Sequence, residues 1–247
     1  MATLYIVATP IGNLEDFTFR ALRVLQEAEV ILCEDTRVTK KLLAHYKIEK
    51  PLLSYHQHSK EDKMQEILNL LLQGKNFALV SDAGTPGISD PGNELIAWFL
   101  RRAEMHEEQN STKTKQLSDF CTIPIVPIPG PSALTALASI VGIPMDKFLF
   151  LGFPPHKKKR KKFFEEIARS THPVIFYESP SRIPKTLGEL NEILRKVAIA
   201  RNHSIVVGRE LTKKFETVYR GTIEGVLEQL QAGKVRGEFV VVVHREK

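Results

Sequence analysis

The chain has 247 residues, 43% hydrophobic and 26% charged, with a formal net charge of +6 at pH 7, which excludes a largely disordered protein. Its two cysteines, Cys33 and Cys121, lie far apart and form neither a disulfide framework nor the ligand spacing of a zinc site, so we expect no metal and a reducing, cytoplasmic location. The apolar runs are too short to cross a bilayer, so no membrane association is expected.

The first half of the chain alternates short β-rich runs with segments of helical periodicity. This alternation predicts a mainly parallel sheet flanked by helices. We expect strands at 4–8, 30–33, 52–55, 77–80 and 123–128, and helices at 16–28, 62–73 and 93–103. These elements form one predicted α/β domain over residues 1–129. The polar segment from Glu104 to Cys121 has almost no apolar residue and is predicted to be an exposed, mobile loop.

Residues 81–92, with the sequence SDAGTPGISDPG, connect the strand at 77–80 to the following helix. Glycines allow positive φ and close approach to a ligand, and prolines stiffen the path. A plain connection explains such a cluster about as well, but twelve residues are long for one. The chain has no P-loop ending and no G-x-G-x-x-G motif. We therefore expect uncommitted backbone N–H groups that hold a small polar molecule without a phosphate cradle.

A second turn of this kind, Pro129 to Ala133, follows the strand at 123–128 and opens a predicted helix at 134–141. Ser132 lies near the N-cap of that helix. Ligands of open α/β sheets gather at the carboxyl ends of the strands, so we expect this turn and the 81–92 loop to line one pocket.

The second half of the chain has more closely spaced strands. We expect strands at 148–153, 174–179, 204–211, 217–221 and 238–244, with helices at 161–169, 183–196 and 223–231. Close spacing near the end implies antiparallel pairing and a mixed sheet. The sequence thus predicts a second α/β domain over residues 130–247, with a ligand cleft between the two domains.

Six consecutive cations, Lys157 to Lys162, account for the net charge, because without them 29 basic residues face 29 acidic ones. They stand at the start of a predicted helix, where the helix dipole disfavours positive charge. A solvated surface run is the alternative interpretation. A concentrated cationic patch is what attraction to a polyanion requires, so we expect an RNA backbone as the partner.

Charged side chains also follow two strands of the first domain. Glu34, Asp35 and Arg37 follow the strand at 30–33, where they would orient a substrate or take up a proton. An ion pair with a helix cap at Asp35 or Thr36 explains this cluster equally well. His56 and His58 follow the strand at 52–55, but the sequence offers no third metal ligand, so a polar or RNA-facing role is favoured.

In the second domain, the segments 176–182 and 209–213 end two strands with charged residues and are candidates for the opposite wall of the cleft. Gly237 and Glu238 precede the last strand. Their position permits close backbone approach to a ligand, although a simple turn explains the glycine as well.

With these motifs in order, the chain resembles the tetrapyrrole methylase superfamily and, within it, the bacterial methylases of small-subunit ribosomal RNA. The matching segments cover nearly the whole length and comprise 4–14, 34–37, 81–92, 129–133, 176–180 and 209–212. The resemblance implies two α/β domains, usually in a homodimer, with S-adenosylmethionine in the cleft. The methyl acceptor it implies is the 2'-hydroxyl of a cytidine in the decoding region of 16S rRNA.

The resemblance also implies site residues. Cofactor contacts are expected from Pro10, Ala83, Gly84, Ile88, Ser132, Ala133, Tyr177, Glu178, Leu211, Gly237 and Glu238. RNA contacts are expected from Arg37, Lys157, Lys158, Lys159, Arg160, Lys161, Lys162 and Arg182. The chain departs from the family in a polar insertion at about 105–119, in Pro154 within the Gly-Phe-Pro-Pro segment, and in Ser181, where a histidine is common. The lysine run is also denser than usual.

Transfer from a sulfonium to a hydroxyl needs alignment of the reactants and removal of a proton. Glu34, Asp35 or His56 would accept that proton, and the sequence does not rank them. One alternative function is carbon methylation of a corrinoid or porphyrin, which the basic run disfavours. Another is a non-catalytic RNA-binding ribosome-assembly factor, which would not bind S-adenosylmethionine.

Overall fold

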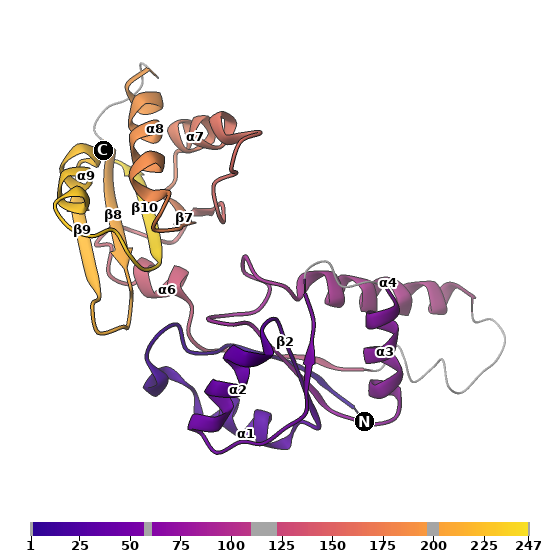
Figure 1. The fold of residues 1–247 in the computed structure, drawn as a ribbon. Coiled ribbons are helices and arrows are strands. Elements are labelled where there is room, and N and C mark those ends of the chain that lie inside the picture. The colour runs from indigo at the N-terminus through magenta and orange to yellow at the C-terminus, as the bar shows by residue number, and fades with distance from the viewer. Residues whose placement is uncertain (1, 57–60, 110–122, 197–202, 247) are drawn as a thin grey trace. The chain divides into compact units, whose positions relative to one another are not determined.

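The computed structural model describes residues 2–56, 61–109, 123–196 and 203–246 (Figure 1). The chain divides into two compact units, Met1–Ser132 and Ala133–Lys247, each with its own sheet. None of the helices in the described ranges is long and apolar enough to cross a membrane.

The first unit is built on a five-stranded sheet of order β3-β2-β4-β1-β5, in which every pair is parallel. Its strands are β1 (Leu4–Val7), β2 (Val30–Cys33), β3 (Leu52–Ser54), β4 (Phe77–Val80) and β5 (Ile125–Ile128). The helices are α1 (Phe19–Glu27), α2 (Thr36–His45), α3 (Glu61–Leu72) and α4 (Asn93–Gln109). Parallel pairing requires such crossover connections, and the predicted parallel α/β sheet is confirmed.

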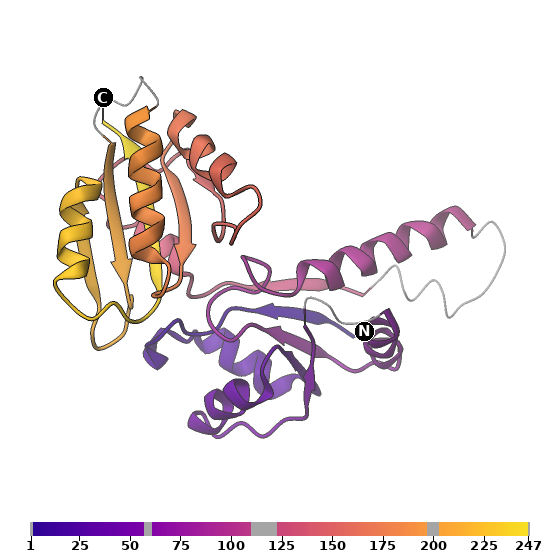
Figure 2. The same cartoon turned by 45° about the horizontal axis from the view of Figure 1, so that its top comes forward.

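Helices cover both faces of this sheet (Figures 1 and 2). On one face, α1 and α2 bury residues such as Leu25 and Leu43 against Ile31. On the other face, α3 and α4 pack against Leu32 and Leu79. Neighbouring strand residues therefore point into opposite cores, which explains why the strands read as continuous apolar runs.

Three elements of the first unit differ from the sequence-based expectations. The predicted helix at 16–28 is a short 3-10 turn, η1 (Leu14–Asp16), followed by α1, because the Thr18 hydroxyl accepts the Ala21 N–H at 3.1 Å and caps the helix there. Helix α2 was not among the expected helices, although the alternative of a helix cap at Asp35 or Thr36 implied its start. Helix α4 continues to Gln109, so the predicted loop from Glu104 begins in a helix. Residues 110–122, with most of the predicted insertion, lie outside the described ranges.

The second unit has a five-stranded sheet of order β6-β7-β10-β8-β9. Its strands are β6 (Leu149–Phe150), β7 (Val174–Glu178), β8 (His203–Arg209), β9 (Thr217–Gly221) and β10 (Phe239–Arg245). The pair β6–β7 is parallel and the other pairs are antiparallel, so the predicted mixed sheet is confirmed. Strand β6 is shorter than the predicted 148–153, and Gly152, at a φ of 64°, turns the chain away.

Three helices, α7 (Arg160–Arg169), α8 (Ile183–Lys196) and α9 (Ile223–Gln231), cover one face of the second sheet. Their buried residues, among them Phe164, Leu187 and Val226, pack against Phe176 and Val241. Helix α6 (Ala133–Ala138) lies against the other face. There Gly208 leaves room for Leu137, whose Cδ1 would be 3.0 Å from a Cβ at that position.

Candidate active site

The parallel sheet of the first unit brings several predicted site residues to one edge. Because its strands run in one direction, the segments that follow them all emerge at the carboxyl edge. These segments carry Pro10 after β1, Glu34 and Asp35 after β2, His56 after β3, the 81–92 loop after β4 and Ser132 after β5. Gln57 and His58 lie outside the described ranges.

Hydrogen bonds tie three of these segments together. Thr9 and Gly84 exchange two backbone hydrogen bonds, of 2.8 Å from the Thr9 N–H and 3.0 Å from the Gly84 N–H. The buried Thr9 hydroxyl donates to the Ser81 carbonyl at 3.1 Å, and the Thr85 hydroxyl donates to the Pro131 carbonyl at 3.1 Å. Gly84 has a φ of 87°, a conformation that an L side chain rarely adopts. The 81–92 loop is therefore held in one shape by its neighbours.

The structure differs from the expectation of uncommitted donors in this loop. The Gly84 N–H donates to Thr9, and the Ile88 N–H donates to the Thr85 carbonyl at 3.3 Å. These two amides stabilise the loop itself. Contact of a ligand with Ala83, Gly84 and Ile88 stays a prediction, and for the last two it would use atoms other than these N–H groups.

Asp35 is the N-cap of α2 and the partner of an exposed arginine. Its Oδ1 accepts the Arg37 N–H at 2.8 Å, and its carboxylate is bound by Arg37 Nε at 3.0 Å and Nη2 at 2.6 Å. Hydrogen bonds from the Arg37 side chain and backbone hold the pKa of Asp35 well below its usual range. The interpretation of this residue as a capping ion pair is confirmed.

Glu34 is half-buried and has the opposite electrostatic environment. Burial raises its pKa most, the negative charge of Asp82 raises it further, and His56 lowers it. Asp82 is held at this point because its Oδ1 accepts the Asp35 N–H at 3.2 Å. His56 Nε2 lies 2.8 Å from the Ser54 hydroxyl. Of the two predicted acids, Glu34 is thus the one whose pKa moves toward neutrality.

The second sheet also gathers its predicted residues at one edge. Strand register places Glu178 beside Phe239, Phe239 beside Arg209, and Arg209 beside Thr217. The chain segments that leave the sheet along this row carry Tyr177, Glu178, Leu211, Gly237 and Glu238. All the predicted cofactor residues of the second unit except Ala133, which opens α6, therefore lie along this row.

Glu178 is almost completely buried, and its carboxylate is committed within the second unit. Oε2 accepts from the Thr186 hydroxyl at 2.6 Å, and Oε1 accepts from the Ser179 N–H at 2.8 Å. Arg182 Nε lies 3.4 Å from Oε1. A ligand contact at Glu178 would therefore involve its backbone. The Tyr177 ring packs edge-on against Phe150, at a centroid distance of 5.0 Å.

The structure differs from the RNA-contact prediction for Arg160. Its guanidinium is buried and donates to Glu189 Oε2 at 2.5 Å, to the Thr186 hydroxyl at 2.7 Å and to the Pro155 carbonyl at 3.1 Å. Arg182 is also largely buried and donates to the Pro154 carbonyl. Both arginines fix the basic loop to the end of β7. The five lysines of the run are exposed.

Sequence reasoning missed Thr186 and Glu189, which complete this network. They are spaced three residues apart on α8, so they share one helix face. A hydroxyl and a carboxylate with that spacing in an amphipathic helix were the only available signal.

Glu210, Lys213 and Glu238 form an ion triad beside Gly237. Lys213 Nζ lies 2.9 Å from Glu210 Oε1 and 3.0 Å from Glu238 Oε2, and the Glu238 N–H donates to Glu210 Oε1 at 3.0 Å. Burial acts to raise the pKa of Glu210, but the hydrogen bonds from Lys213 and the Glu238 amide outweigh it and lower that pKa.

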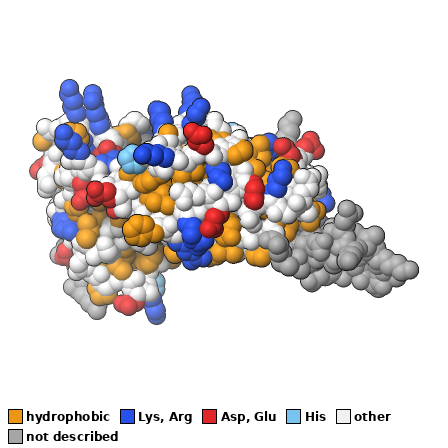
Figure 3. All heavy atoms as spheres, turned by 90° about the horizontal axis from the view of Figure 1, so that it is seen from below, with side chains coloured by type: hydrophobic (Ala, Val, Ile, Leu, Met, Phe, Trp, Pro, Cys, Tyr) orange, Lys and Arg blue, Asp and Glu red, His pale blue; other side chains and the backbone are white. Residues whose placement is uncertain are grey.

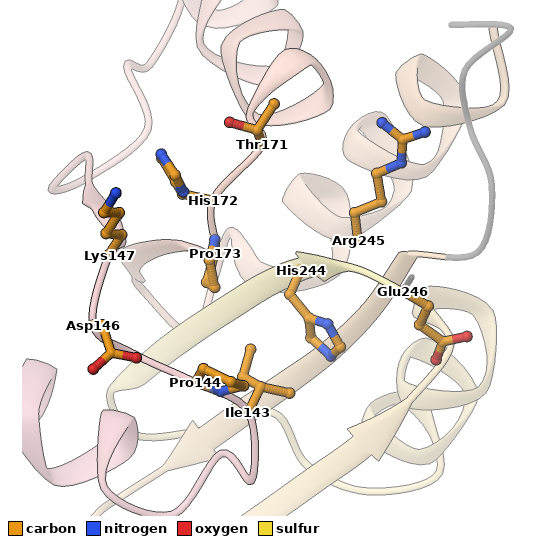
Figure 4. Close-up of a pocket in the computed structure, with 10 residues that line it drawn as sticks. All are labelled: Ile143, Pro144, Asp146, Lys147, Thr171, His172, Pro173, His244, Arg245 and Glu246. Carbon is orange, nitrogen blue, oxygen red and sulfur yellow. The ribbon is translucent and has the colours of Figure 1, made fainter.

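A cavity of about 950 Å³ opens at the other edge of the second sheet (Figure 4). It lies where β7 begins and β10 ends. Its lining residues are Ile143, Pro144, Asp146, Lys147, Thr171, His172, Pro173, His244, Arg245 and Glu246. None of the predicted site residues is among them, and Lys147 and Arg245 extend from opposite sides of the cavity. We therefore do not place the candidate site there.

Outside the lysine run the charge is balanced, and the face drawn in Figure 3 shows basic, acidic and hydrophobic side chains interspersed. Within the described ranges, no three His, Cys, Asp or Glu side chains are grouped so as to hold a metal ion.

Gly237→Ala is expected to destabilise the protein by about 1–3 kcal/mol, because its φ is 90° and a Cβ there would lie 2.3 Å from Glu210 Cγ. Urea unfolding followed by circular dichroism measures the change. Gly233→Ala is the matched control, since a Cβ there would meet no atom within 4 Å. Equal stability of the two variants would contradict the steric argument.

Asp82→Asn is expected to lower the pKa of Glu34, since it removes a negative charge but keeps an oxygen that accepts from Asp35. Because the pKa of Glu34 is raised in the folded state, the free energy of unfolding of the wild type falls as the pH rises through that pKa. In the variant this fall should be smaller. NMR titration of ¹³C-labelled glutamate carboxyl groups measures the shift, with Asp146→Asn in the second unit as the control. An unchanged pKa would refute the coupling.

Comparisons with known proteins identify the family of this chain. The family model for tetrapyrrole (corrin/porphyrin) methylases matches residues 3–227. Proteins named ribosomal RNA small subunit methyltransferase I are similar over 97–98% of this chain. The Bacillus subtilis protein is 44% identical, with 75% of its length covered, and the Thermotoga maritima protein is 38% identical, with 98% of its length covered.

Solved structures share the fold at lower identity. A cobalt precorrin-4 methyltransferase of cobalamin biosynthesis aligns with a TM-score of 0.66 at 18% identity, covering 98% of this chain and 94% of that one. The uroporphyrin-III C-methyltransferase of Thermus thermophilus, complexed with S-adenosylhomocysteine, aligns with a TM-score of 0.60 at 18% identity, covering 98% and 97%. The chain belongs to the tetrapyrrole methylase family and, within it, to the group of the ribosomal RNA small subunit methyltransferase I proteins.

Proposed function

We propose that this protein transfers a methyl group from S-adenosylmethionine to the 2'-hydroxyl of a cytidine in the decoding region of 16S rRNA. The observation that carries the proposal is similarity at 38–44% identity, over nearly the whole chain, to proteins named for methylation of small-subunit ribosomal RNA. A homodimer and a cytoplasmic location remain predictions from the sequence.

The residues present suit a cofactor that carries a sulfonium and no phosphate. In the first unit, Pro10, the 81–92 loop and Ser132 stand at one sheet edge, and the Thr9–Gly84 hydrogen bonds fix their backbone. In the second unit, Tyr177, Leu211 and Gly237 lie along one sheet edge. S-adenosylmethionine would supply an electrophilic methyl carbon. The crystallised Thermus relative that holds S-adenosylhomocysteine supports this choice.

Among the candidate proton acceptors, we assign the role to Glu34. An effective general base has a pKa near the working pH, and burial together with Asp82 raises that of Glu34, while Arg37 lowers that of Asp35. With the methyl carbon and the thioether leaving group supplied by the cofactor, Glu34 would take up the proton that the ribose hydroxyl loses on methylation. In this assignment Asp35 has a structural role, because it caps α2.

Five exposed lysines of the 157–162 run support RNA as the acceptor. Neutralising phosphates releases counterions and gives strong, sequence-independent attraction. Arg160 and Arg182 hold this loop through Glu178, Thr186 and Glu189, so the lysines are displayed from a fixed backbone. Carbon methylation of a macrocycle and cofactor-free RNA binding stay as alternatives, and the assays below separate them.

Glu34→Gln is expected to lower kcat about 10²- to 10⁴-fold while S-adenosylmethionine still binds, because the amide cannot take up the proton. Transfer of tritiated methyl to small-subunit RNA measures kcat, mass spectrometry locates the methylated ribose, and calorimetry measures cofactor binding. Asp35→Asn keeps a capping oxygen and is expected to lose less than 10-fold. Full activity of Glu34→Gln would remove Glu34 from this role. Wild-type protein that methylates no RNA would overturn the proposed function.

Replacing Lys157, Lys158, Lys159, Lys161 and Lys162 by glutamine is expected to weaken RNA binding and to flatten its salt dependence. Since each neutralised phosphate contributes roughly 0.7–0.9 to the slope of log affinity against log salt, the loss of five lysines should lower the slope by up to about 3.5–4.5. Fluorescence anisotropy at several salt concentrations measures it. Arg160 stays in place because it is buried. An unchanged slope would refute RNA docking by this run.

A further inference from the structure

The turn between β8 and β9 displays a large aromatic side chain to solvent. Phe215 is 68% exposed, and Lys214 Nζ lies 5.7 Å from the centroid of its ring. Burying a phenylalanine ring normally favours folding, and this exposed ring contributes little buried apolar area to the unit. A single exposed apolar residue is common on protein surfaces, and it carries meaning only with further observations.

The backbone of the turn that carries Phe215 is strained and hydrogen-bonded. Glu210 and Thr212 have φ values of 51° and 67°, which are unfavourable for residues other than glycine. The Lys213 N–H donates to the Glu210 carbonyl and the Glu216 N–H donates to the Lys213 carbonyl, both at 3.0 Å. These hydrogen bonds define the backbone of the turn, which limits the backbone entropy lost when a ligand contacts Phe215.

The acidic side chains around the turn are all paired or hydrogen-bonded. Glu210 and Glu238 share Lys213, and Glu216 accepts the Thr212 N–H. Lys214 is exposed, and so is Arg236, whose carbonyl accepts from Arg209 Nε at 2.8 Å. Four cations, Arg209, Lys213, Lys214 and Arg236, thus stand against three carboxylates, so this end of the sheet offers a ligand a small positive excess and one aromatic face.

The turn lies on the same sheet edge of the second unit as the anchored basic loop. Thr217, the residue after the turn, is paired with Arg209, and Phe239 is paired with both Arg209 and Glu178, so these four residues form one row across the sheet. Glu178 in turn holds the loop through Thr186 and Arg160. One strand of RNA that follows this edge would meet the lysines of the run and the ring of Phe215.

We propose that Phe215 is a stacking platform for an unpaired RNA base, with Lys214 contacting the adjacent phosphate. This inference rests on the proposed function, which makes RNA the substrate. An aromatic face accepts any base, but only one that is not stacked within a duplex. The site therefore prefers single-stranded segments and loops over helical RNA.

The test compares Phe215→Ala, Phe215→Leu, Phe215→Tyr and wild type by fluorescence anisotropy, with labelled oligocytidylate as single strand and an RNA duplex of equal length. Alanine and leucine variants are expected to bind the single strand roughly 5-fold or more weakly, whereas tyrosine restores affinity. The salt slope should not change because no charge is lost. Phe19→Ala, at a ring 92% exposed in the first unit, is the matched control.

Each outcome decides the inference. Equal affinity of Phe215→Ala and wild type, or the same loss with Leu, Tyr and the duplex, would overturn the stacking platform. Thermal unfolding of the variants excludes misfolding, and wild-type methyl transfer is measured in parallel. If wild type methylates RNA while Phe215→Ala binds it normally, only the stacking platform fails. If wild type neither binds nor methylates RNA, the proposed function fails.

Discussion

The pair of backbone hydrogen bonds between Thr9 and Gly84 is the constraint on which the first unit's candidate site depends. It closes the segment after β1 onto the segment after β4, two strands that are neighbours in the sheet. A loop of this length would otherwise lose considerable conformational entropy when it orders around a ligand. Because the amides are used internally, the loop is shaped before any ligand arrives.

The second unit achieves the same rigidity with buried charge. Glu178, Thr186 and Arg160 form a chain of charge-assisted hydrogen bonds that reaches from the end of β7 to the basic loop. A buried carboxylate is costly unless its oxygens are bonded, and here both of them are. The same residues that satisfy this requirement hold five mutually repelling lysines in a defined place.

The parallel and mixed sheets followed from the sequence because strand runs and helical periodicity are local signals. Helix α2 was not expected from the sequence, because the charged cluster at its start, Glu34 to Arg37, also suits a surface ion pair. Arg160 had the same appearance as its lysine neighbours, and only packing against α8 separates it from them. The sequence also could not show that the Gly84 N–H is hydrogen-bonded within the protein, because its partner Thr9 lies 75 residues away.

Charged side chains of opposite sign in the two units suit different ligands: carboxylates in the first unit suit a sulfonium, and lysines in the second unit suit RNA phosphates. In the first unit, Glu34 and Asp82 stand together at the carboxyl edge, and the negative charge of Asp82 raises the cost of ionising Glu34. A sulfonium brought to that edge would relieve part of this repulsion, so donor binding and the protonation of Glu34 should be linked. In the second unit the exposed lysines repel one another, and a phosphate backbone relieves that repulsion in turn. Each ligand would thus remove a repulsion that the free protein maintains.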